Sequence, residues 1–239
     1  MTRTLLLSLI ALLAPLAAEA QAPRSPSPSP SPPPAAPQPR PAGRVTGKVT
    51  VTEADGRAAA GAEVIVYVVG FKEPPAKTTA TIRQQGRRFV PDLVAITAGD
   101  RVVFPNNDPF LHNVFSHSPA RQFDLGSYRR GDQKDKDFPD PGVVDVYCNI
   151  HPEMAATILV LPNRRHTRAG SDGRFVLDGV PPGTWTVFAY TRRALKPASA
   201  KVRVAAGAAA AVNLAIVRGA KTEHLNKYGT PYTPGTSYP

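Results

Sequence analysis

Residues 145–154 read DVYCNIHPEM and contain the only cysteine of the 239-residue chain. In an extended strand alternate residues share a face, so Val146 and Cys148 point the same way and Cys148 ends the strand facing a core. His151 and Met154 follow within six residues. The polar, proline-bearing sequence around them predicts a loop that leads into a second strand. This loop brings a thiol, an imidazole and a thioether together.

The donor atoms of this loop indicate a soft metal ion. A thiolate and an imidazole suit copper or zinc, whereas a thioether favours copper. Met154 is the only methionine apart from Met1, which makes its place beside His151 informative. A methionine that fills the core and a structural histidine are the alternatives. The loop alone leaves them open.

Four roles are open to Cys148 itself. A single cysteine cannot form an internal disulfide, so the thiol is a metal ligand, a buried bystander, an intermolecular link or a nucleophile. A nucleophile with His151 as its base needs an orienting group and an oxyanion site, and it leaves Met154 unexplained. The metal-ligand interpretation accounts for all three residues.

A second motif, FPNNDPFLHN at 104–113, lies upstream of the loop. Apolar residues 102–104 predict a strand that ends at the turn sequence PNNDP, and His112 follows this turn. A trigonal site of two imidazoles and one thiolate needs one distant histidine in addition to Cys148 and His151. His112 is the candidate for this distant histidine.

The two motifs together resemble those of the cupredoxins, the blue-copper family that includes plastocyanin, azurin and amicyanin. The resemblance covers roughly residues 81–161, and the CxxHxxM spacing is most similar to the short ligand loop of amicyanin. It implies one type 1 copper ion. The implied ligands are His112, Cys148 and His151 in the plane, with Met154 as a weak axial ligand.

The resemblance also implies a function. Asn113 is expected to lie behind the ligands and tie the two ligand loops together, and the edge of His151 is expected to be the electron port. The implied protein carries single electrons between periplasmic redox partners, such as a cytochrome or a dehydrogenase, and is not an enzyme. A copper-binding or copper-buffering protein, or a carbohydrate-binding-like interaction protein, is the alternative. We expect no metal role for His117, His166 and His224, which have no partner ligands nearby in the sequence.

The pattern of the folded part predicts an all-β protein. Short β-branched runs alternate with clusters of Gly, Pro, Asn and Asp, as in sandwiches and barrels, and no convincing amphipathic helix interrupts them. Residues 205–211 are rich in alanine and favour either a helix or a turn between two strands. The predicted strands are 44–52, 62–69, 93–97, 101–104, 143–147, 157–161, 174–177, 184–190, 201–204 and 212–217.

Sequences on both sides of the copper motifs resemble a second module. SDGRFVLDGVPPGTWTVFAY at 171–190 resembles the later half of the carboxypeptidase regulatory-like (transthyretin-like) module, and GRVTGKVTVTEADGRAAAGAEVIVYV at 43–68 resembles its opening. We therefore expect a cupredoxin Greek-key β-sandwich inserted in, or flanked by, a small regulatory-like β-sandwich. The alternative is that residues 43–70 supply extra cupredoxin strands.

The expected domain boundaries follow from these motifs and from composition. The copper domain is 80–162, and the second sandwich combines its first strands at 43–72 with the remainder at 163–218. A polar, proline-bearing tail occupies 219–239. The role of the module is expected to be structural or adhesive, and sugar binding is only a weak option because the sequence shows no aromatic platform.

The N-terminal sequence predicts export. Residues 1–20 have a positive charge, an apolar run and a small-x-small end, as in a cleaved signal peptide, and the run is short for an uncleaved membrane anchor. Residues 21–42 form a Pro/Ser-rich linker. The expected location is periplasmic or secreted, with no membrane span in the mature chain. The formal net charge of +11 is scattered rather than organised for nucleic acid, so it favours an acidic partner or membrane surface.

Overall fold

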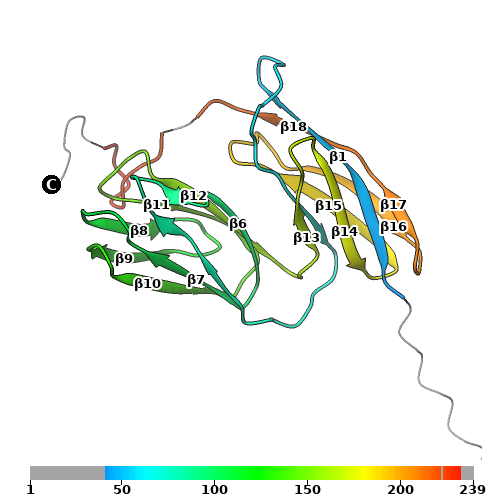
Figure 1. The fold of residues 1–239 in the computed structure, drawn as a ribbon, viewed down its shortest axis with the longest axis horizontal. Coiled ribbons are helices and arrows are strands. Elements are labelled where there is room, and N and C mark those ends of the chain that lie inside the picture. Colours follow the sequence, from blue (N-terminus) through cyan, green and yellow to red (C-terminus); the bar gives the residue numbers. More distant parts are fainter. Residues whose placement is uncertain (1–40, 222, 233–239) are drawn as a thin grey trace, which may run out of the picture. The chain divides into compact units, whose positions relative to one another are not determined.

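The computed structural model describes residues 41–221 and 223–232, and every regular element in these ranges is a β-strand (Figure 1). The predicted all-β class is confirmed. The first nine strands are β1 Gly43–Glu53, β2 Ile65–Val69, β3 Thr79–Thr81, β4 Arg83–Gln84, β5 Phe89–Val90, β6 Leu93–Thr97, β7 Asp100–Pro105, β8 His112–Ser116 and β9 Phe123–Tyr128. The others are β10 Gln133–Phe138, β11 Gly142–Tyr147, β12 Ala155–Leu161, β13 His166–Arg168, β14 Arg174–Val180, β15 Gly183–Tyr190, β16 Ala198–Val204, β17 Ala209–Ala211 and β18 Leu214–Arg218.

The strands between β3 and β12 form the part of the molecule that carries the copper motifs. A five-stranded sheet has the order β6-β12-β11-β8-β9, a three-stranded sheet has the order β10-β7-β3, and β4 pairs with β5. One apolar core is shared by these sheets and includes Phe104, Phe138, Ile158, Cys148 and Met154. The cysteine and methionine of the motif are therefore core residues at one end of this core.

The remaining strands form two further sheets. One contains β14-β1-β17, with β18 also paired to β1, and the other has the order β13-β2-β15-β16. β1 runs antiparallel to β14 and parallel to β17 and β18, as Figure 1 shows. Among the described residues, neither β1 nor β2 pairs with a strand from the copper-motif segment 79–161. Val45, Phe175, Leu177 and Ile216 belong to the core of this second group.

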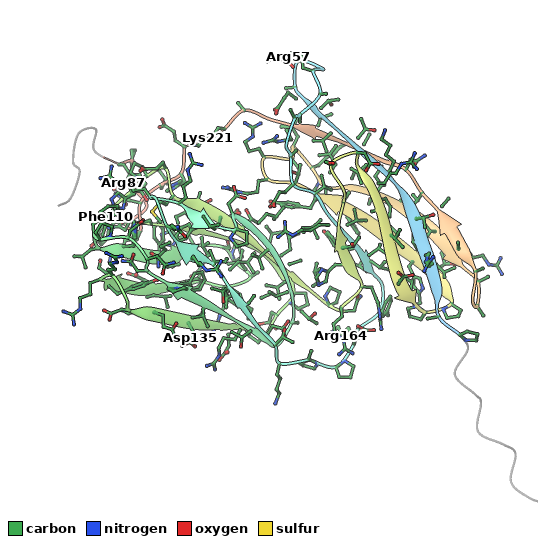
Figure 2. The ribbon with its side chains drawn as sticks, viewed as in Figure 1. Arg57, Arg87, Phe110, Asp135, Arg164 and Lys221 are labelled. Carbon is green, nitrogen blue, oxygen red and sulfur yellow. The ribbon has the colours of Figure 1, made fainter. Side chains whose placement is uncertain are left out.

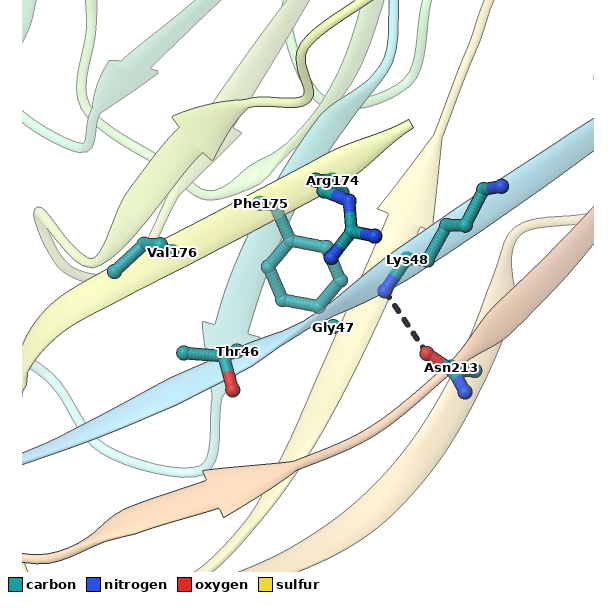
Figure 3. Close-up of a pocket in the computed structure, with 7 residues that line it drawn as sticks. All are labelled: Thr46, Gly47, Lys48, Arg174, Phe175, Val176 and Asn213. Carbon is teal, nitrogen blue, oxygen red and sulfur yellow. Dashed lines mark hydrogen bonds between the residues drawn. The ribbon is translucent and has the colours of Figure 1, made fainter. Parts of the chain in front are cut away.

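β1 changes partner from β17 to β18 near Gly47. A Cβ at Gly47 would stand 1.7 Å from the carbonyl oxygen of Val212, so only glycine permits this approach. The backbone N–H of Lys48 donates to Asn213 Oδ1 at 3.0 Å, in the shallow hollow drawn in Figure 3. The aromatic residue of that hollow, Phe175, is 4% exposed and packs into the core. The hollow therefore has no exposed aromatic face.

The two ends of the copper-motif segment are held together by hydrogen bonds. The N–H of Glu73 donates to the carbonyl of Pro162 at 3.1 Å. The side-chain amide of Asn163 donates to the carbonyls of Val68 and Phe71, both at 3.0 Å. Asn163 is fully buried, so its side-chain amide needs partners inside the protein, and these two carbonyls supply them.

Three further predictions concern the alanine-rich stretch at 205–211, the N-terminal residues and membrane-spanning helices. The alanine-rich stretch is a turn and a strand, because Ala208 N–H bonds to Ala205 O and Gly207 adopts a φ of 66°. The predicted signal peptide at 1–20, and the predicted linker at 21–42 up to residue 40, lie outside the described residues. Within the described part, no helix has the length and hydropathy required to span a membrane.

Candidate metal centre

Two segments supply the residues of the predicted site. His112 is the first residue of β8, and Cys148, His151 and Met154 lie in the loop between β11 and β12. The loop is closed on itself, since Cys148 N–H donates to Met154 O at 3.2 Å and Met154 N–H donates to His151 O at 3.1 Å. Strand pairing between β11 and β12 thus continues into the loop and fixes its ends.

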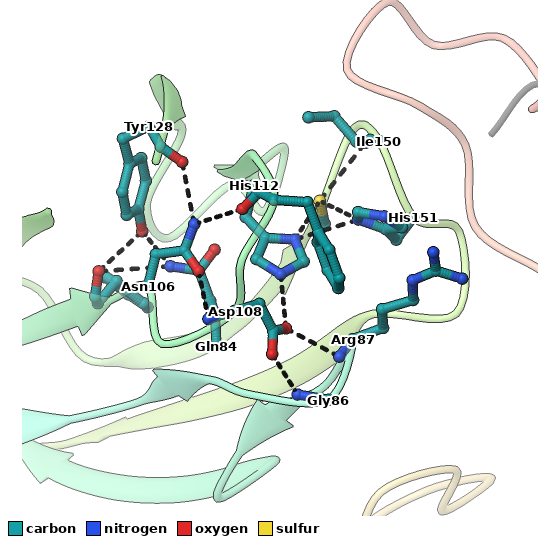
Figure 4. A network of polar contacts seen from close by, with 12 residues as sticks. Gln84, Gly86, Arg87, Asn106, Asp108, His112, Tyr128, Ile150 and His151 are labelled. Atoms are coloured by element: carbon teal, nitrogen blue, oxygen red, sulfur yellow. Dashed lines mark hydrogen bonds and ion pairs between the residues drawn. The ribbon is translucent and has the colours of Figure 1, made fainter. Parts of the chain in front are cut away.

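Three donor atoms of these residues meet at one point (Figure 4). The Nδ1 atoms of His112 and His151 are each 3.8 Å from Cys148 Sγ and 3.1 Å from one another. All three side chains are buried, and they form the metal-ligand cluster of the described residues. Bond lengths of about 2.0 Å to imidazole nitrogen and about 2.3 Å to sulfur let one ion reach all three atoms. The sequence-predicted trio is therefore brought together.

Met154 lies beside this trio but its role is not decided by the same geometry. Its side chain is fully buried and packs in the same core as Cys148. A core position suits both a weak axial ligand and a filling residue. Its ligand role therefore stays a prediction.

Burial sets the protonation of the three donors. Loss of water lowers the pKa of His112 and of His151, with the neighbouring imidazole lowering the pKa of His151 further. Burial also raises the pKa of the Cys148 thiol. Without a metal, the site thus holds neutral imidazoles and a protonated thiol near neutral pH, and a bound metal ion would take the place of the thiol proton.

Backbone amides surround the sulfur. Ile150 N–H donates to Cys148 Sγ at 3.4 Å, and the N–H groups of Asn113 and His151 also act to lower the pKa of the thiol against the effect of burial. Such donors favour the thiolate, which is the form that binds metal. The site is therefore built to accept a negative sulfur once a cation is present.

Asn113 lies next to His112, where the sequence predicts a residue that ties the ligand loops together. Its backbone N–H faces the sulfur of Cys148, as described above, while its side-chain amide donates to Asp124 Oδ1 at 2.6 Å. Asp124 is on β9, so the side chain joins β8 to its neighbouring strand rather than to the Cys148 loop.

Asp108 is a site residue that sequence reasoning missed. Its Oδ2 accepts a hydrogen bond from His112 Nε2 at 2.8 Å, and its carboxylate also accepts from the N–H groups of Gly86 at 2.7 Å and Arg87 at 2.9 Å. Burial alone would raise the pKa of Asp108, but these donors hold it below its usual value. The signal in the sequence was an acidic residue, Asp108, four positions before the predicted ligand His112. Its turn, PNNDP, by itself predicts only the end of a strand.

The turn that carries Asp108 is itself fixed by buried polar groups. Asn106 donates through its side chain to the carbonyls of Phe110 at 2.9 Å and Tyr128 at 3.0 Å, and its Oδ1 accepts from Asp108 N–H at 2.9 Å. Gln84 and Tyr128 hydrogen-bond to one another beneath it (Figure 4). This network explains why the PNNDP sequence holds His112 in one position.

Phe110 covers the two imidazoles on the outer side. Its ring centroid is 5.2 Å from that of His112 and 5.4 Å from that of His151. The guanidinium carbon of Arg87 lies over the Phe110 ring, 5.1 Å from its centroid, and Figure 2 labels the two residues next to each other. His151 is 6% exposed and Leu111 is 44% exposed. Only a small edge of His151, the predicted electron port, is exposed. The Phe110 ring lies next to His151, and the guanidinium of Arg87 lies over that ring.

The histidines for which no metal role is expected have other contacts. His117 Nε2 donates to Lys227 O at 3.1 Å, and His224 Nε2 donates to Pro152 O at 2.7 Å. His166 lies in β13, where burial lowers its pKa. The contact of His224 with the ligand loop was not predicted, and a histidine between polar tail residues gave no signal for it.

The donor set described here fits copper. When His112 Nε2–H donates to Asp108, its Nδ1 presents a lone pair toward Cys148, and two nitrogens with one thiolate form the trigonal set of blue-copper sites. A dry pocket with sulfur and imidazole donors disfavours ions that prefer oxygen. Copper and zinc both accept these three atoms, so a fourth donor is needed to separate them.

Comparison with solved structures gives cupredoxins. A purple cupredoxin from Nitrosopumilus maritimus matches 34% of this chain and 98% of its own, with 24% identity and a TM-score of 0.31. A reduced amicyanin variant matches 40% of this chain and 97% of its own, with 16% identity and a TM-score of 0.33. A Cu-containing nitrite reductase from Thermus scotoductus matches 47% of this chain with 22% identity and a TM-score of 0.33, and this chain covers 28% of it. No family model and no curated protein sequence matches the chain.

The expectation that the chain is not an enzyme needs correction. One of the matched solved structures is named as a nitrite reductase, which is an enzyme. A buried metal-ligand cluster does not separate enzymes from proteins without a catalytic role, because function is decided by the site and not by the fold. The exclusion of enzymatic activity is therefore wrong as an inference from this resemblance.

Proposed function

We propose that this chain is an exported copper protein that holds one type 1 copper ion and carries single electrons between redox partners. The observation that supports it is the meeting of two imidazole nitrogens and one sulfur, from His112, His151 and Cys148, in a buried site. Met154 is the axial ligand in this proposal. A bound copper ion supplies a one-electron change between two oxidation states that prefer different coordination.

The residues of the chain perform the remaining work. Asp108 holds His112 in one tautomer and one orientation, and the closed loop from Cys148 to Met154 keeps the other donors in place. Phe110 excludes water from the imidazoles. Donors held in this way move little when the charge of the metal changes, so electron transfer requires little reorganisation.

The electron partner is proposed to be an acidic redox protein, such as a cytochrome or a dehydrogenase. Exposed arginines lie on two turns that hydrogen-bond to the Asn106–Asp108 region: Asn107 N–H donates to Gln84 O, and Asn106 N–H donates to Asp132 O. These rim arginines are Arg87, Arg88, Arg129 and Arg130. A positive rim around an apolar centre raises the rate of encounter with a negative partner and does so less at high salt.

The flanking sandwich is proposed to be a carboxypeptidase regulatory-like module with a structural role, formed by residues 43–72 and 163–218 around a copper domain at 80–162. The pairing of β1 with β14, β17 and β18 supports this division. Export to the periplasm or the exterior through a signal peptide at 1–20 is part of the proposal, and it rests on the sequence pattern.

The test is spectroscopy and voltammetry of the copper-loaded protein. An electron carrier gives an intense visible thiolate-to-copper band, an electron-resonance signal of type 1 copper and a reversible one-electron couple. A copper-buffering protein binds the ion without a reversible couple, and this outcome would replace electron transfer by copper storage. A colourless complex would remove the type 1 site altogether.

A further inference from the structure

A segment of the C-terminal tail lies against the ligand loop, and we name residues 223–232 the C-terminal strap. The strap contains no regular secondary structure. Its contacts are nevertheless concentrated on the two segments that carry the predicted ligands. A role of the strap at the metal centre rests on the proposed copper function. The experiment is chosen so that failure of the strap proposal can be told apart from failure of that function.

Three hydrogen bonds join the strap to the ligand loop. Lys227 N–H donates to Asn149 Oδ1 at 3.0 Å. His224 Nε2 donates to the carbonyl of Pro152 at 2.7 Å. The hydroxyl of Tyr232 donates to the carbonyl of Cys148 at 2.7 Å. Within itself the loop makes two backbone bonds and the Ile150 N–H bond to Cys148 Sγ, so the strap adds as many hydrogen bonds as the loop makes alone.

Aromatic packing seats the strap on the end of β11. The ring of His224 stacks on that of Tyr147, with centroids 4.0 Å apart and planes inclined by 23°. Tyr232 meets the edge of His224 at 5.2 Å. Tyr147 precedes Cys148 directly, so this packing lies one residue from the sulfur.

The strap also reaches the segment that carries His112. The carbonyl of Lys227 accepts from His117 Nε2 at 3.1 Å, and Lys227 Nζ pairs with Asp124 at 2.9 Å. Asp124 in turn accepts from the side chain of Asn113. Lys227 therefore contacts both the ligand loop and the surroundings of β8 through separate atoms.

We propose that the C-terminal strap is a structural part of the metal centre, and that Lys227, His224 and Tyr232 are positioning residues that fix the ligand loop relative to β8. The ion pair is the weaker component, because Lys227 and Asp124 are 25% and 42% exposed and solvent screens such pairs. The hydrogen bonds to Asn149, Pro152 and Cys148 are the stronger component, since each holds one residue of the ligand loop.

The experiment removes side-chain contacts and keeps ring shape. In a His224→Phe, Tyr232→Phe double variant the stack on Tyr147 is retained, while the bonds to Pro152 O and Cys148 O are lost. The matched control is Tyr228→Phe, which removes a hydroxyl from the same strap at a residue that is 75% exposed. A single Tyr232→Phe variant serves as the milder change.

The first readout is amide hydrogen exchange of the copper-free protein. We expect exchange at the Cys148 and Met154 amides to become about tenfold faster or more in the double variant, because local opening no longer breaks the strap bonds. Exchange at the Val45 amide, which belongs to the other core, is expected to stay unchanged in the double variant. In the Tyr228→Phe control, exchange at the loop amides is expected to equal that of the wild type. Equal protection of the loop amides in wild type and double variant would overturn the proposal.

The second readout is the reduction potential and electron-resonance spectrum of the copper-loaded protein. Because the loop is held less firmly in the double variant, its reduction potential and its electron-resonance spectrum are expected to change. Both are expected to stay unchanged in the control. If the wild type gives no reversible couple, the electron-transfer function fails, while the exchange experiment still decides whether the strap holds the loop. If the couple is present and identical in all variants, the strap does not position the ligands.

Discussion

Asp108 Oδ2 and His112 Nε2 lie 2.8 Å apart, on the edge of the imidazole opposite to the Nδ1 atom that faces Cys148. The carboxylate accepts a hydrogen bond from Nε2–H, so Nδ1 is left with a lone pair directed into the site. Two backbone N–H groups, from Gly86 and Arg87, hold the carboxylate itself. One acid thereby connects a neighbouring turn to a proposed metal ligand.

Asp108→Asn is expected to weaken copper binding about 10- to 100-fold, the usual effect of removing the partner of a ligating histidine. The amide cannot accept from three donors as the carboxylate does, so one N–H loses its partner. Titration with a competing chelator measures the affinity. Asp132→Asn is the control, since Asp132 is an exposed acid of the adjoining turn and its side chain pairs with the exposed Arg129. Equal affinities in both variants and wild type would show that Asp108 does not support the ligand.

Cys148→Ser is expected to abolish the intense visible band of the copper-loaded protein. Only a deprotonated sulfur bound to copper gives this charge-transfer transition, and a serine oxygen does not replace it. Absorption spectroscopy after copper(II) addition checks the result. A band that persists in the serine variant would exclude Cys148 as the ligand.

Met154→Leu is expected to keep the band and most of the copper affinity while raising the reduction potential, and Met154→Gln is expected to lower it. A weak axial thioether contributes little to holding the ion but affects the balance between copper(II) and copper(I). If Met154 only fills the core, the leucine variant loses less than about 1.5 kcal/mol of stability and its potential does not change. Voltammetry of the three proteins separates these cases.

Glu73→Gln is expected to destabilise the copper-free protein by about 1 to 2 kcal/mol at pH 7, because Glu73 accepts hydrogen bonds from Arg164 and Arg165. Burial raises the pKa of Glu73, but these bonds hold it below its ordinary value of 4.5. Its stabilising contribution is therefore complete above pH 4.5 and is lost as pH falls through the lower folded pKa.

Urea unfolding at pH 7 and pH 3, followed by the fluorescence of Trp185, measures this difference. Trp185 is the only tryptophan and packs against Phe71, two residues from Glu73. The difference between wild type and variant is expected to shrink at pH 3. Glu63→Gln is the control, since the pair of Glu63 with Arg168 is largely exposed. A difference that is the same at both pH values would contradict the assigned ion pair.

Local sequence predicted much of the strand pattern and less of its edges. β6 and β12 were indicated by apolar runs because both are buried on two sides. β10, which reads QKDKDF, was not predicted, because its alternate residues are charged and exposed and the strand is stabilised by pairing with β7. Pairing partners are long-range contacts that a local pattern does not contain.

The site was predictable where residue type is rare and decisive. Cys148 and His151 stand close in the sequence, and His112 was predicted as the second imidazole of a trigonal site; the structure brings these three together, and the ligand role of Met154 stays a prediction. Asp108, in contrast, looks like an ordinary turn residue, and its function depends on the distance to His112 that only folding creates. The contacts of the C-terminal strap were invisible for the same reason, since they join residues about eighty positions apart.

The bond between Glu73 N–H and Pro162 O means that the chain leaves the flanking sandwich and returns to it at nearly the same place. The entropy of closing such an excursion grows only slowly with its length, and insertions are tolerated where the two ends meet. The segment between Glu73 and Pro162 therefore has the layout of an insertion. A short turn grafted between these two positions would meet the same pair of anchor points, and it would uncover Ile65, which packs with Leu93, Leu159 and Leu161 of the removed segment.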